Sequence, residues 1–396
     1  MSAAVKARTA LLYEPRVEGH HLAWLRFMVE DLLGAGWQLT LAVDTRPDAY
    51  ERIRKRLGPL LEMVSVLPAW EESGKKIGGP GVGAVAECFA RAGTELVFLD
   101  TFDEIASSLL RRAALGRMPP ELLRGRMGGI YIRPRFMAGR GFSPNEWLKS
   151  RGFATLMRGG WFSHLLFLDP WIQESCRARF PATPTQALPD PCPDHFKTEA
   201  LPARIHFEIP AGRKVFLFYG GAYRRKGLHL AVEAFLQLPG DCPAFLLCAG
   251  QQPDDLRVKH GLDTLVRAGR ARVISRYIFE EEEKRLFAAS DVVLLPYIKH
   301  FGNSAVLSRA AGAGKPVIAS DEELVGRLAG EHKLGLLFSS GNPAALRRAI
   351  IQAVQARAEE WVAWQAAAAR YAAHSSRAQF RRILLEAFDQ VQPSRR

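Results

Sequence analysis

The sequence is poor in cysteine. Its 396 residues include five cysteines, which are scattered along the chain without a CxxC pair. That spacing argues against a zinc site and against a disulfide framework, and it favours a reducing compartment. Long apolar runs are missing as well. The first residues hold too short a run for a signal peptide, and no stretch approaches the length of a membrane span, so we expect a cytoplasmic protein.

Patterns of nucleic-acid recognition are also missing, because the sequence has no RNP-like or helix-turn-helix pattern. Positive charge is in excess instead, since 54 lysines and arginines stand against 41 aspartates and glutamates, a formal net charge of +13. Arginines are dense over residues 111–158, and basic residues fill 52–56. These segments suit the anionic inner face of a membrane or an anionic acceptor. For any single residue, an ordinary solvated surface is the better explanation.

Apolar runs alternate with helical patterns, as in α/β proteins. A strand at 9–13, a loop, a helix and a second strand at 38–43 follow one another, which implies a parallel sheet, and the same order recurs from residue 214. Further strands are expected at 61–67, 95–100, 129–132, 164–168, 215–219, 244–249, 272–275, 292–295, 317–319 and 335–338.

A proline cluster separates the two halves of the chain. Five prolines lie within residues 181–193, and such a stretch favours a connection between domains. We therefore predict four segments. They are an N-terminal Rossmann-like domain at 1–190, a linker at 191–213, a second Rossmann-like domain at 214–372 and a C-terminal helix at 373–396.

Residues 292–320 are the most informative stretch, because they read as strand, loop, helix and strand. Asn303 or Ser304 can cap the helix, and Gly302 lets a ligand approach the backbone closely. The free amides of the first turn and the helix dipole behind them suit a phosphate. This loop lies at the carboxyl end of a strand, which is where open α/β sheets bind their ligands.

The loop at 220–227 carries a second phosphate-binding pattern. It follows the strand at 215–219 and places Arg224, Arg225 and Lys226 beside flexible glycines. A diphosphate is bound by backbone amides together with lysine and arginine side chains. Two such loops on one sheet edge are better evidence than either alone.

The order of these motifs resembles that of a known family. After the basic loop come LLCAG at 246–250, SDVVLLPY at 290–297, AGAGKPVIAS at 311–320 and GLLF at 335–338. Over roughly residues 214–350 the chain resembles the donor domain of GT-B glycosyltransferases, most closely the retaining family 4 group. The resemblance implies an α/β protein with two Rossmann-like parallel-sheet domains facing a central cleft. It also implies that the second domain binds a nucleotide-diphospho-sugar.

The resemblance also implies roles for single residues. Lys226 matches the lysine that contacts the donor diphosphate, whereas the family arginine falls on Gly221, so Arg224 or Arg225 is left to replace it. Tyr277 lies where the family contacts the nucleotide base. With Asn303 from the helix start and Glu323 as a replacement acid, the predicted donor-binding residues are Gly19, Gly221, Arg224, Arg225, Lys226, Tyr277, Asn303, Ser304, Ala305, Val306 and Glu323.

The chain departs from the family at two glutamates, spaced eight positions apart, that contact the donor sugar and the ribose. Their positions hold Phe301 and Arg309 here. Glu322 or Glu323, just after the next strand, is a partial replacement, and an ordinary charged helix start explains them equally well.

The catalytic candidates lie in the first half of the chain. His20 and His21 follow the first strand, and a histidine there can contact the diphosphate or an acceptor hydroxyl. Asp100 and Asp103 stand at another strand end and can bind or activate an acceptor hydroxyl, although Asp103 also suits a helix N-cap. We predict His20, His21 and Asp103 as the catalytic set. Neither a metal nor another cofactor is expected, because no DxD pair stands near the phosphate site.

These observations predict a hexosyltransferase-type enzyme that uses a nucleotide sugar. Its acceptor is a glycan, a lipid-linked compound or a small molecule, and the resemblance implies transfer with retention. Peripheral attachment to the inner face of the membrane is compatible with the charge. Two alternatives stay open: a GT-B-shaped binding or scaffold protein without catalysis, and a sugar-nucleotide epimerase of the same architecture.

Overall fold

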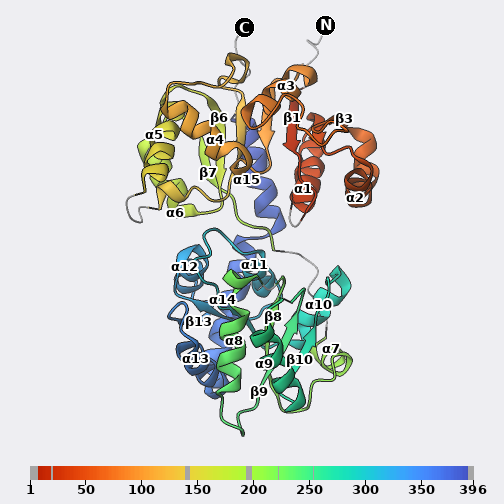
Figure 1. The fold of residues 1–396 in the computed structure, drawn as a ribbon, viewed down its shortest axis with the longest axis vertical. Helices are drawn as coiled ribbons and strands as arrows, with labels where there is room; N and C mark the ends of the chain where they lie inside the picture. The colour runs from red at the N-terminus through yellow and green to blue at the C-terminus, as the bar shows by residue number, and fades with distance from the viewer. Residues whose placement is uncertain are drawn as a thin grey trace. The chain divides into compact units, whose positions relative to one another are not determined.

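The computed structural model describes residues 8–18, 21–138, 143–192, 199–221, 223–252 and 254–390. The chain folds into two compact units (Figure 1). The first contains Met1–Leu188 together with Arg381–Arg396, and the second contains Pro189–Phe380. Each unit is a parallel sheet with helices, so the α/β fold class predicted from the sequence is confirmed.

The first unit contains a seven-stranded sheet in the order β3-β2-β1-β4-β5-β6-β7. All its strand pairs are parallel. The strands are β1 Thr9–Glu14, β2 Gln38–Val43, β3 Ser65–Pro68, β4 Leu96–Leu99, β5 Met127–Tyr131, β6 Phe162–Phe167 and β7 Thr185–Ala187. The α-helices are α1 His21–Gly34, α2 Pro47–Leu57, α3 Val82–Ala92, α4 Asp103–Ala114, α5 Pro144–Arg158 and α6 Pro170–Arg179, and the short 3₁₀ helices are η1 Gly58–Met63, η2 Glu121–Leu123 and η3 Arg135–Met137.

The second unit contains a six-stranded sheet in the order β10-β9-β8-β11-β12-β13, again parallel throughout. Its strands are β8 Lys214–Tyr219, β9 Ala244–Ala249, β10 Ala271–Ile274, β11 Val292–Leu295, β12 Val317–Ser320 and β13 Gly335–Phe338. Its helices are α7 Ala200–His206, η4 Arg224–Lys226, α8 Leu228–Leu236, α9 Leu256–Arg267, α10 Glu280–Ala289, α11 Ala305–Gly312, α12 Glu323–Glu331, α13 Pro343–Gln355 and α14 Ala358–His374.

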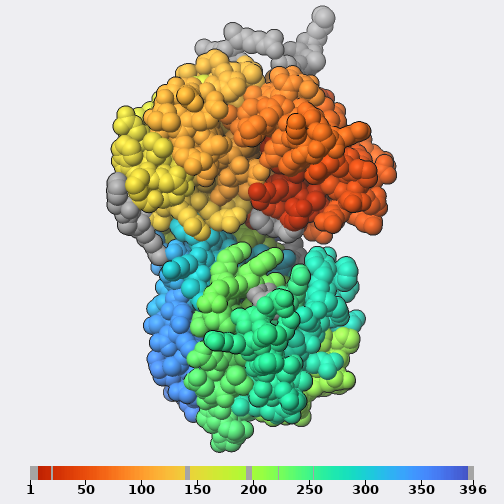
Figure 2. All heavy atoms as spheres, in the orientation of Figure 1, coloured from red at the N-terminus to blue at the C-terminus, as the bar shows by residue number. Residues whose placement is uncertain are grey.

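The strands are apolar because both faces of each sheet are covered. All six residues of β9 are buried, as are all four of β4 and of β11. A parallel sheet covered by helices on both sides has near-continuous apolar strands of this kind. In the second unit, α8 and α9 lie in front of the sheet, and their side chains cover the strands in the space-filling view (Figures 1 and 2).

The last helix, α15 (Arg377–Asp389), begins in the second unit and continues into the first. Phe388 is fully buried there, with its ring 5.2 Å from that of Trp37, 5.1 Å from that of Phe98 and 5.3 Å from that of His164. The residues at the end of the chain thus complete the core of its first half.

Three segments differ from the sequence-based expectation. The strand expected at 61–67 begins at Ser65, because the 3₁₀ helix η1 occupies the residues before it. Within the proline cluster, Thr185–Ala187 forms the edge strand β7. In the expected linker, Ala200–His206 folds as α7, which packs against α10 and belongs to the second unit.

Both sheets have a point at which the order of the strands reverses. It lies between β1 and β4 in the first sheet and between β8 and β11 in the second. Ligands of open α/β sheets bind outside the carboxyl ends of the strands at such points. Each unit therefore has one preferred place for a site, and each is described separately below.

Candidate functional site

In the second unit, the basic loop after β8 meets the loop after β11. Gly227 makes this contact possible, because it has a φ of 74° and a Cβ there would lie 1.8 Å from the carbonyl oxygen of Pro296. The backbone N–H of Ile298 donates to the carbonyl of Arg225 over 2.9 Å, which fastens the two loops together. The two loops predicted from the sequence therefore lie side by side.

A chain of hydrogen bonds joins the predicted residues of these two loops. Lys226 Nζ donates to the hydroxyl of Tyr297 over 2.7 Å, and that hydroxyl lies 2.9 Å from Ser304 Oγ. Ser304 is the N-cap of α11, and its hydroxyl accepts the N–H of Val306 over 3.3 Å. The lysine is thereby linked to the helix terminus through Tyr297, which is 3% exposed and was not predicted from the sequence.

A second contact joins the same loops through His300. The guanidinium of Arg225 lies against His300 Nδ1, and His300 Nε2 is 3.2 Å from the carbonyl oxygen of Asn303. Asn303 in turn accepts the N–H of Ser304 through its side chain, over 2.7 Å. Both arginines left open by the sequence are exposed, and Arg225 is the one that makes this contact with the loop after β11.

The other predicted donor-binding residues occupy different places. Gly221 is half-buried, and a Cβ on it would lie 3.2 Å from the ring of Tyr223. Ala305 begins α11 directly after the cap. Tyr277 follows β10, is 75% exposed and packs edge-on against Phe279 at 5.1 Å. Its ring is therefore open to a ligand but lies on another loop.

Glu322 and Glu323 follow β12 and differ in their contacts. Glu322 Oε2 accepts the N–H of Lys299 over 3.1 Å and lies 2.7 Å from the hydroxyl of Ser340. Its carboxylate therefore connects the loops after β11 and β13. Glu323 starts α12 with a φ of 60°, a backbone conformation that is uncommon for a residue with a side chain.

Arg309 and Phe301 occupy the two positions at which the sequence analysis expected a departure from the family, and their surroundings differ. Arg309 Nε donates to Glu283 Oε1 over 2.8 Å, and the hydroxyl of Tyr219 donates to the other oxygen of this carboxylate. Burial lowers the pKa of Arg309, but the charge and hydrogen bond of Glu283 raise it overall. The arginine is thus neutralised by an acid that comes from α10. Phe301 is half-buried in the loop before α11.

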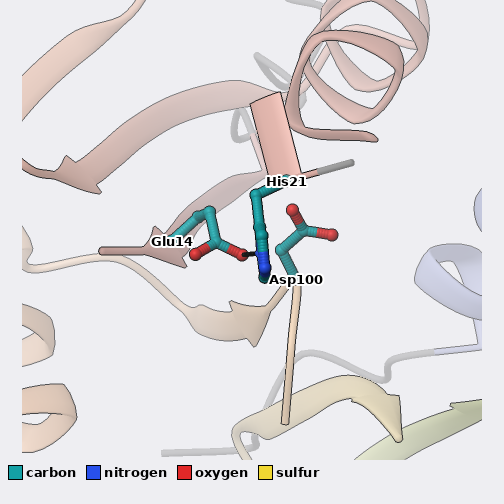
Figure 3. Close-up of side chains that lie close together, drawn as sticks. All are labelled: Glu14, His21 and Asp100. Atoms are coloured by element: carbon teal, nitrogen blue, oxygen red, sulfur yellow. Dashed lines mark hydrogen bonds and ion pairs between the residues drawn. The ribbon is translucent and has the colours of Figure 1, made fainter. Parts of the chain in front are cut away.

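In the first unit, polar side chains meet at the carboxyl ends of β1 and β4, and Figure 3 draws three of them, Glu14, His21 and Asp100. Glu14 ends β1, His21 begins α1, and Asp100 and Thr101 follow β4. His21 Nδ1 lies 2.9 Å from Glu14 Oε2, and the hydroxyl of Thr101 is 3.3 Å from the same oxygen and 3.2 Å from Nδ1. Glu14 was not singled out in the sequence, although its place at the end of the first strand is the signal that would have found it.

Asp100 stands beside this pair and is fully buried. Neither of its carboxylate oxygens receives a donor from the described residues, and the Glu14 carboxylate lies within hydrogen-bonding reach. Burial and the neighbouring Glu14 carboxylate raise the pKa of Asp100 well above its ordinary value. An acid in such surroundings needs a proton or a cation to balance its charge.

Asp103 forms its hydrogen bonds with a different part of the first unit. Its carboxylate accepts the N–H of Ile132 over 2.7 Å and the N–H of Arg133 over 2.9 Å. Burial raises its pKa, and these bonds partly oppose the rise. The side chain thus ties the start of α4 to the loop after β5. The other predicted residues of the first unit, Gly19 and His20, lie outside the described residues.

Comparison with known proteins agrees with this arrangement. Residues 203–370 match the family described as glycosyl transferases group 1. No curated protein sequence matches the chain. Among the described residues, no helix has the length and apolar character needed to cross a membrane.

Several solved structures are similar in fold to the whole chain. Sucrose-phosphate synthase from Thermosynechococcus elongatus is 18% identical, with 97% of this chain and 99% of that one covered and a TM-score of 0.66. A glycosyltransferase from Rickettsia africae is 14% identical over 98% and 99%, with a TM-score of 0.68. Anabaena HepE, solved with UDP, is 14% identical over 96% and 99%, also at 0.68. The predicted GT-B resemblance and fold are therefore confirmed.

Proposed function

We propose that this chain, which has the GT-B fold and matches glycosyl transferases group 1 over residues 203–370, transfers a sugar from a nucleotide-diphospho-sugar to an acceptor. The observation that carries the proposal is the contact from Lys226 through Tyr297 to Ser304 at the strand reversal of the second sheet. The family match includes all of these residues. Structures of HepE with UDP and with UDP-glucose support the class of donor.

The donor diphosphate would bind where this contact meets the start of α11. Lys226 offers an ammonium group that Tyr297 already orients, and the first turn of α11 offers backbone N–H groups and the positive end of the helix dipole. These groups would stabilise the negative charge that develops on the leaving diphosphate. They are fixed before the substrate arrives, so little reorganisation is needed.

The remaining donor contacts follow from their places around this centre. Arg225 would supply the second cation to the diphosphate, after releasing or sharing its contact with His300. Tyr277 would stack on the nucleotide base, because most of its surface is exposed. Asn303 and Ala305 would shape the entry to the helix terminus.

The acceptor would be held by the first unit, where His21 and the carboxylates near it gather. The proposed transfer proceeds with retention, and the leaving phosphate takes the proton of the acceptor hydroxyl, so that no strong base is required. The reaction as proposed needs no metal at the diphosphate. The excess of basic residues favours an anionic acceptor or an anionic membrane surface beside it.

A second candidate function is binding without catalysis. It is favoured by Phe301 and Arg309, which replace the two glutamates that the family uses for the donor sugar and the ribose. In this case the diphosphate site would persist while the sugar is not positioned for transfer. The two candidates therefore agree on nucleotide binding and differ on turnover.

A thermal-shift screen against UDP, GDP, ADP and TDP tests nucleotide binding. A ligand that binds only the folded chain stabilises it and so raises the melting temperature. At a ligand concentration of 100 Kd the added free energy of unfolding is about 2.7 kcal/mol. We expect one nucleotide to give a shift that Lys226→Ala and Ser304→Ala both abolish. The control is Lys259→Ala, which removes a surface lysine of the same unit that pairs with Asp254. No shift with any nucleotide at millimolar concentration would overturn the proposal.

A further inference from the structure

The cluster of Glu14, His21 and Asp100 has the placement of a ligand site. Tyr13 of β1 and Leu99 of β4 are paired in the sheet, so Glu14 and Asp100 leave adjacent strands at the same edge. This edge is the point at which the strand order of the first sheet reverses. The three side chains are 1%, 7% and 0% exposed.

The hydrogen-bond donors around the cluster are fewer than the acceptors. Glu14 Oε1 accepts the N–H of Arg16 over 2.9 Å, and Glu14 Oε2 receives both His21 and Thr101. In the part of the chain that the structure describes, no donor reaches either oxygen of Asp100. A fully buried carboxylate that receives no donor and faces a second carboxylate is costly, because burial removes the water that would otherwise solvate it.

We propose that Glu14, His21 and Asp100 bind a divalent transition-metal ion of the kind represented by Zn²⁺ or Mn²⁺. One nitrogen or oxygen atom from each residue lies within 4.8 Å of the others, and Figure 3 shows the three side chains close together. Imidazole nitrogen suits zinc, carboxylate oxygen suits manganese, and a mixed set of this kind accepts either.

A cation bound between these side chains compensates both the shortage of hydrogen-bond donors and the negative charge of the two carboxylates. It coordinates the Asp100 carboxylate, which receives no donor, and it takes the position of the proton between His21 Nδ1 and Glu14 Oε2. Metal–ligand distances of about 2.0–2.2 Å require the three atoms to draw closer, which rotation of the side chains can achieve. Two carboxylates and a divalent ion together carry no net charge, so the burial of the cluster is compensated.

A proton on Asp100 is the competing solution. It neutralises the carboxyl group and lets it donate to the Glu14 carboxylate, but it brings no donor to the other oxygen of Asp100 and leaves the contact of His21 with Glu14 as it is. The two explanations therefore predict different results when metal is removed from the protein and then added back. Only a metal site predicts that the added ion is bound and stabilises the fold.

Metal titration of the full-length, tag-free protein tests the proposal. After treatment with EDTA and removal of the chelator, we expect Zn²⁺, Mn²⁺ and Co²⁺ each to raise the melting temperature, and elemental analysis after dialysis to retain about one ion per chain. Bound Co²⁺ should give a visible absorption spectrum that identifies nitrogen and oxygen ligands.

Variants show whether these residues are the ligands. Asp100→Asn should weaken Co²⁺ binding by more than roughly tenfold, and His21→Gln should do the same and change the spectrum. Asp44→Asn is the matched control, because Asp44 is a buried acid after β2 that pairs with Arg46. The wild-type titration alone suffices should a variant fail to fold.

Two results would overturn the proposal. One is a wild-type protein whose melting temperature does not respond to any of the three metals and which retains none. The other is an Asp100→Asn protein that binds Co²⁺ as tightly as the wild type. Neither result depends on sugar transfer, so this proposal and the proposed function fail independently.

Discussion

Among single residues, Tyr297 links the two loops of the proposed donor site. It is almost completely buried, and its hydroxyl lies between Lys226 Nζ and Ser304 Oγ. A free lysine side chain loses conformational freedom when it binds a ligand. Because Tyr297 already holds Lys226, part of that cost is met in the folded protein, and the ammonium group is directed toward the start of α11.

Replacing Tyr297 by phenylalanine tests this positioning. The variant keeps the ring and loses the hydroxyl, so we expect nucleoside diphosphate affinity to fall about 3- to 10-fold, which corresponds to a hydrogen bond of roughly 1 kcal/mol. Isothermal titration calorimetry measures the change. Tyr371→Phe is the control, since Tyr371 is buried in α14 of the same unit. Unchanged affinity in Tyr297→Phe would show that the hydroxyl does not orient the lysine.

The pair of Arg309 and Glu283 leads to a prediction about stability. Glu283 is 8% exposed and is bonded by both Arg309 and Tyr219, so removing the arginine leaves a largely buried acid without its countercharge. We expect Arg309→Met to lower the free energy of unfolding by about 2 kcal/mol. Adding Glu283→Gln should restore part of the loss, measured by a double-mutant cycle in urea. Losses that simply add would mean that the two residues are not coupled.

At the residue scale, the sequence indicated one residue of each hydrogen-bonded pair that joins the loops after β8 and β11. Lys226, Arg225 and Ser304 were found because glycines and a helix start mark them locally. Tyr297 and His300 were missed because they act as partners of residues about 70 positions earlier, a relation that only the adjacency of β8 and β11 creates. In the cluster of Figure 3, His21 and Asp100 were singled out and Glu14 was missed, because the pairing of β1 with β4 is what brings Glu14 beside Asp100.

At the scale of secondary-structure elements, α15 connects the end of the chain to the core of its beginning. Phe388→Ala would leave a cavity against Trp37, Phe98 and His164, and we expect a loss of about 3–5 kcal/mol in the unfolding free energy of the first unit. Urea unfolding followed by tryptophan fluorescence measures it.

The matched control for this helix is Val362→Ala on α14, where the side chain is 64% exposed. Its effect should stay within about 0.5 kcal/mol. Equal losses in the two variants would show that the last helix is not part of the core of the first unit.

The sequence located most strands because a buried parallel strand is a short apolar run, as in β9 and β11. It placed β3 too early because Leu61 and Met63 extend the apolar run into η1, where Gly58 and Pro59 impose a tight turn. It missed β7 because that strand is three residues long and lies among prolines. Edge strands of this length have too little pattern to detect.

At the scale of the whole molecule, acid stability depends on buried groups such as His164. This imidazole is fully buried against Phe98 and Phe388, and burial lowers its pKa from 6.5 to about 3. Below pH 6.5 the unfolded chain binds a proton at this residue and the folded chain does not. Stability from this group is therefore complete above pH 6.5 and is lost as the pH falls toward 3.

A variant without the imidazole should lose this dependence. Between pH 7 and pH 5 the wild type should lose about 2 kcal/mol of unfolding free energy through His164 alone, whereas His164→Asn should lose correspondingly less. Urea unfolding at the two pH values gives the comparison. The same difference in both proteins would place the titrating group elsewhere.

The architecture as a whole was predictable because, in each half of the chain, apolar strand-length runs alternate with segments that have helical spacing. The substrate was not, since the residues that choose a sugar and an acceptor are few, and the two positions where the resemblance led us to expect glutamates hold Phe301 and Arg309. Fold similarity at 11–18% identity carries the architecture without the specificity.

The most direct test of the proposed function is the release of nucleoside diphosphate from nucleotide sugars. For the nucleotide that stabilises the protein, the matching sugar nucleotides would be incubated with the enzyme and the released diphosphate measured. The proposal predicts release by the wild type, accelerated by an acceptor, and at least a hundredfold slower release by Lys226→Ala, about 2.7 kcal/mol of transition-state stabilisation. Binding without release for every sugar nucleotide would contradict transfer and identify a binding protein.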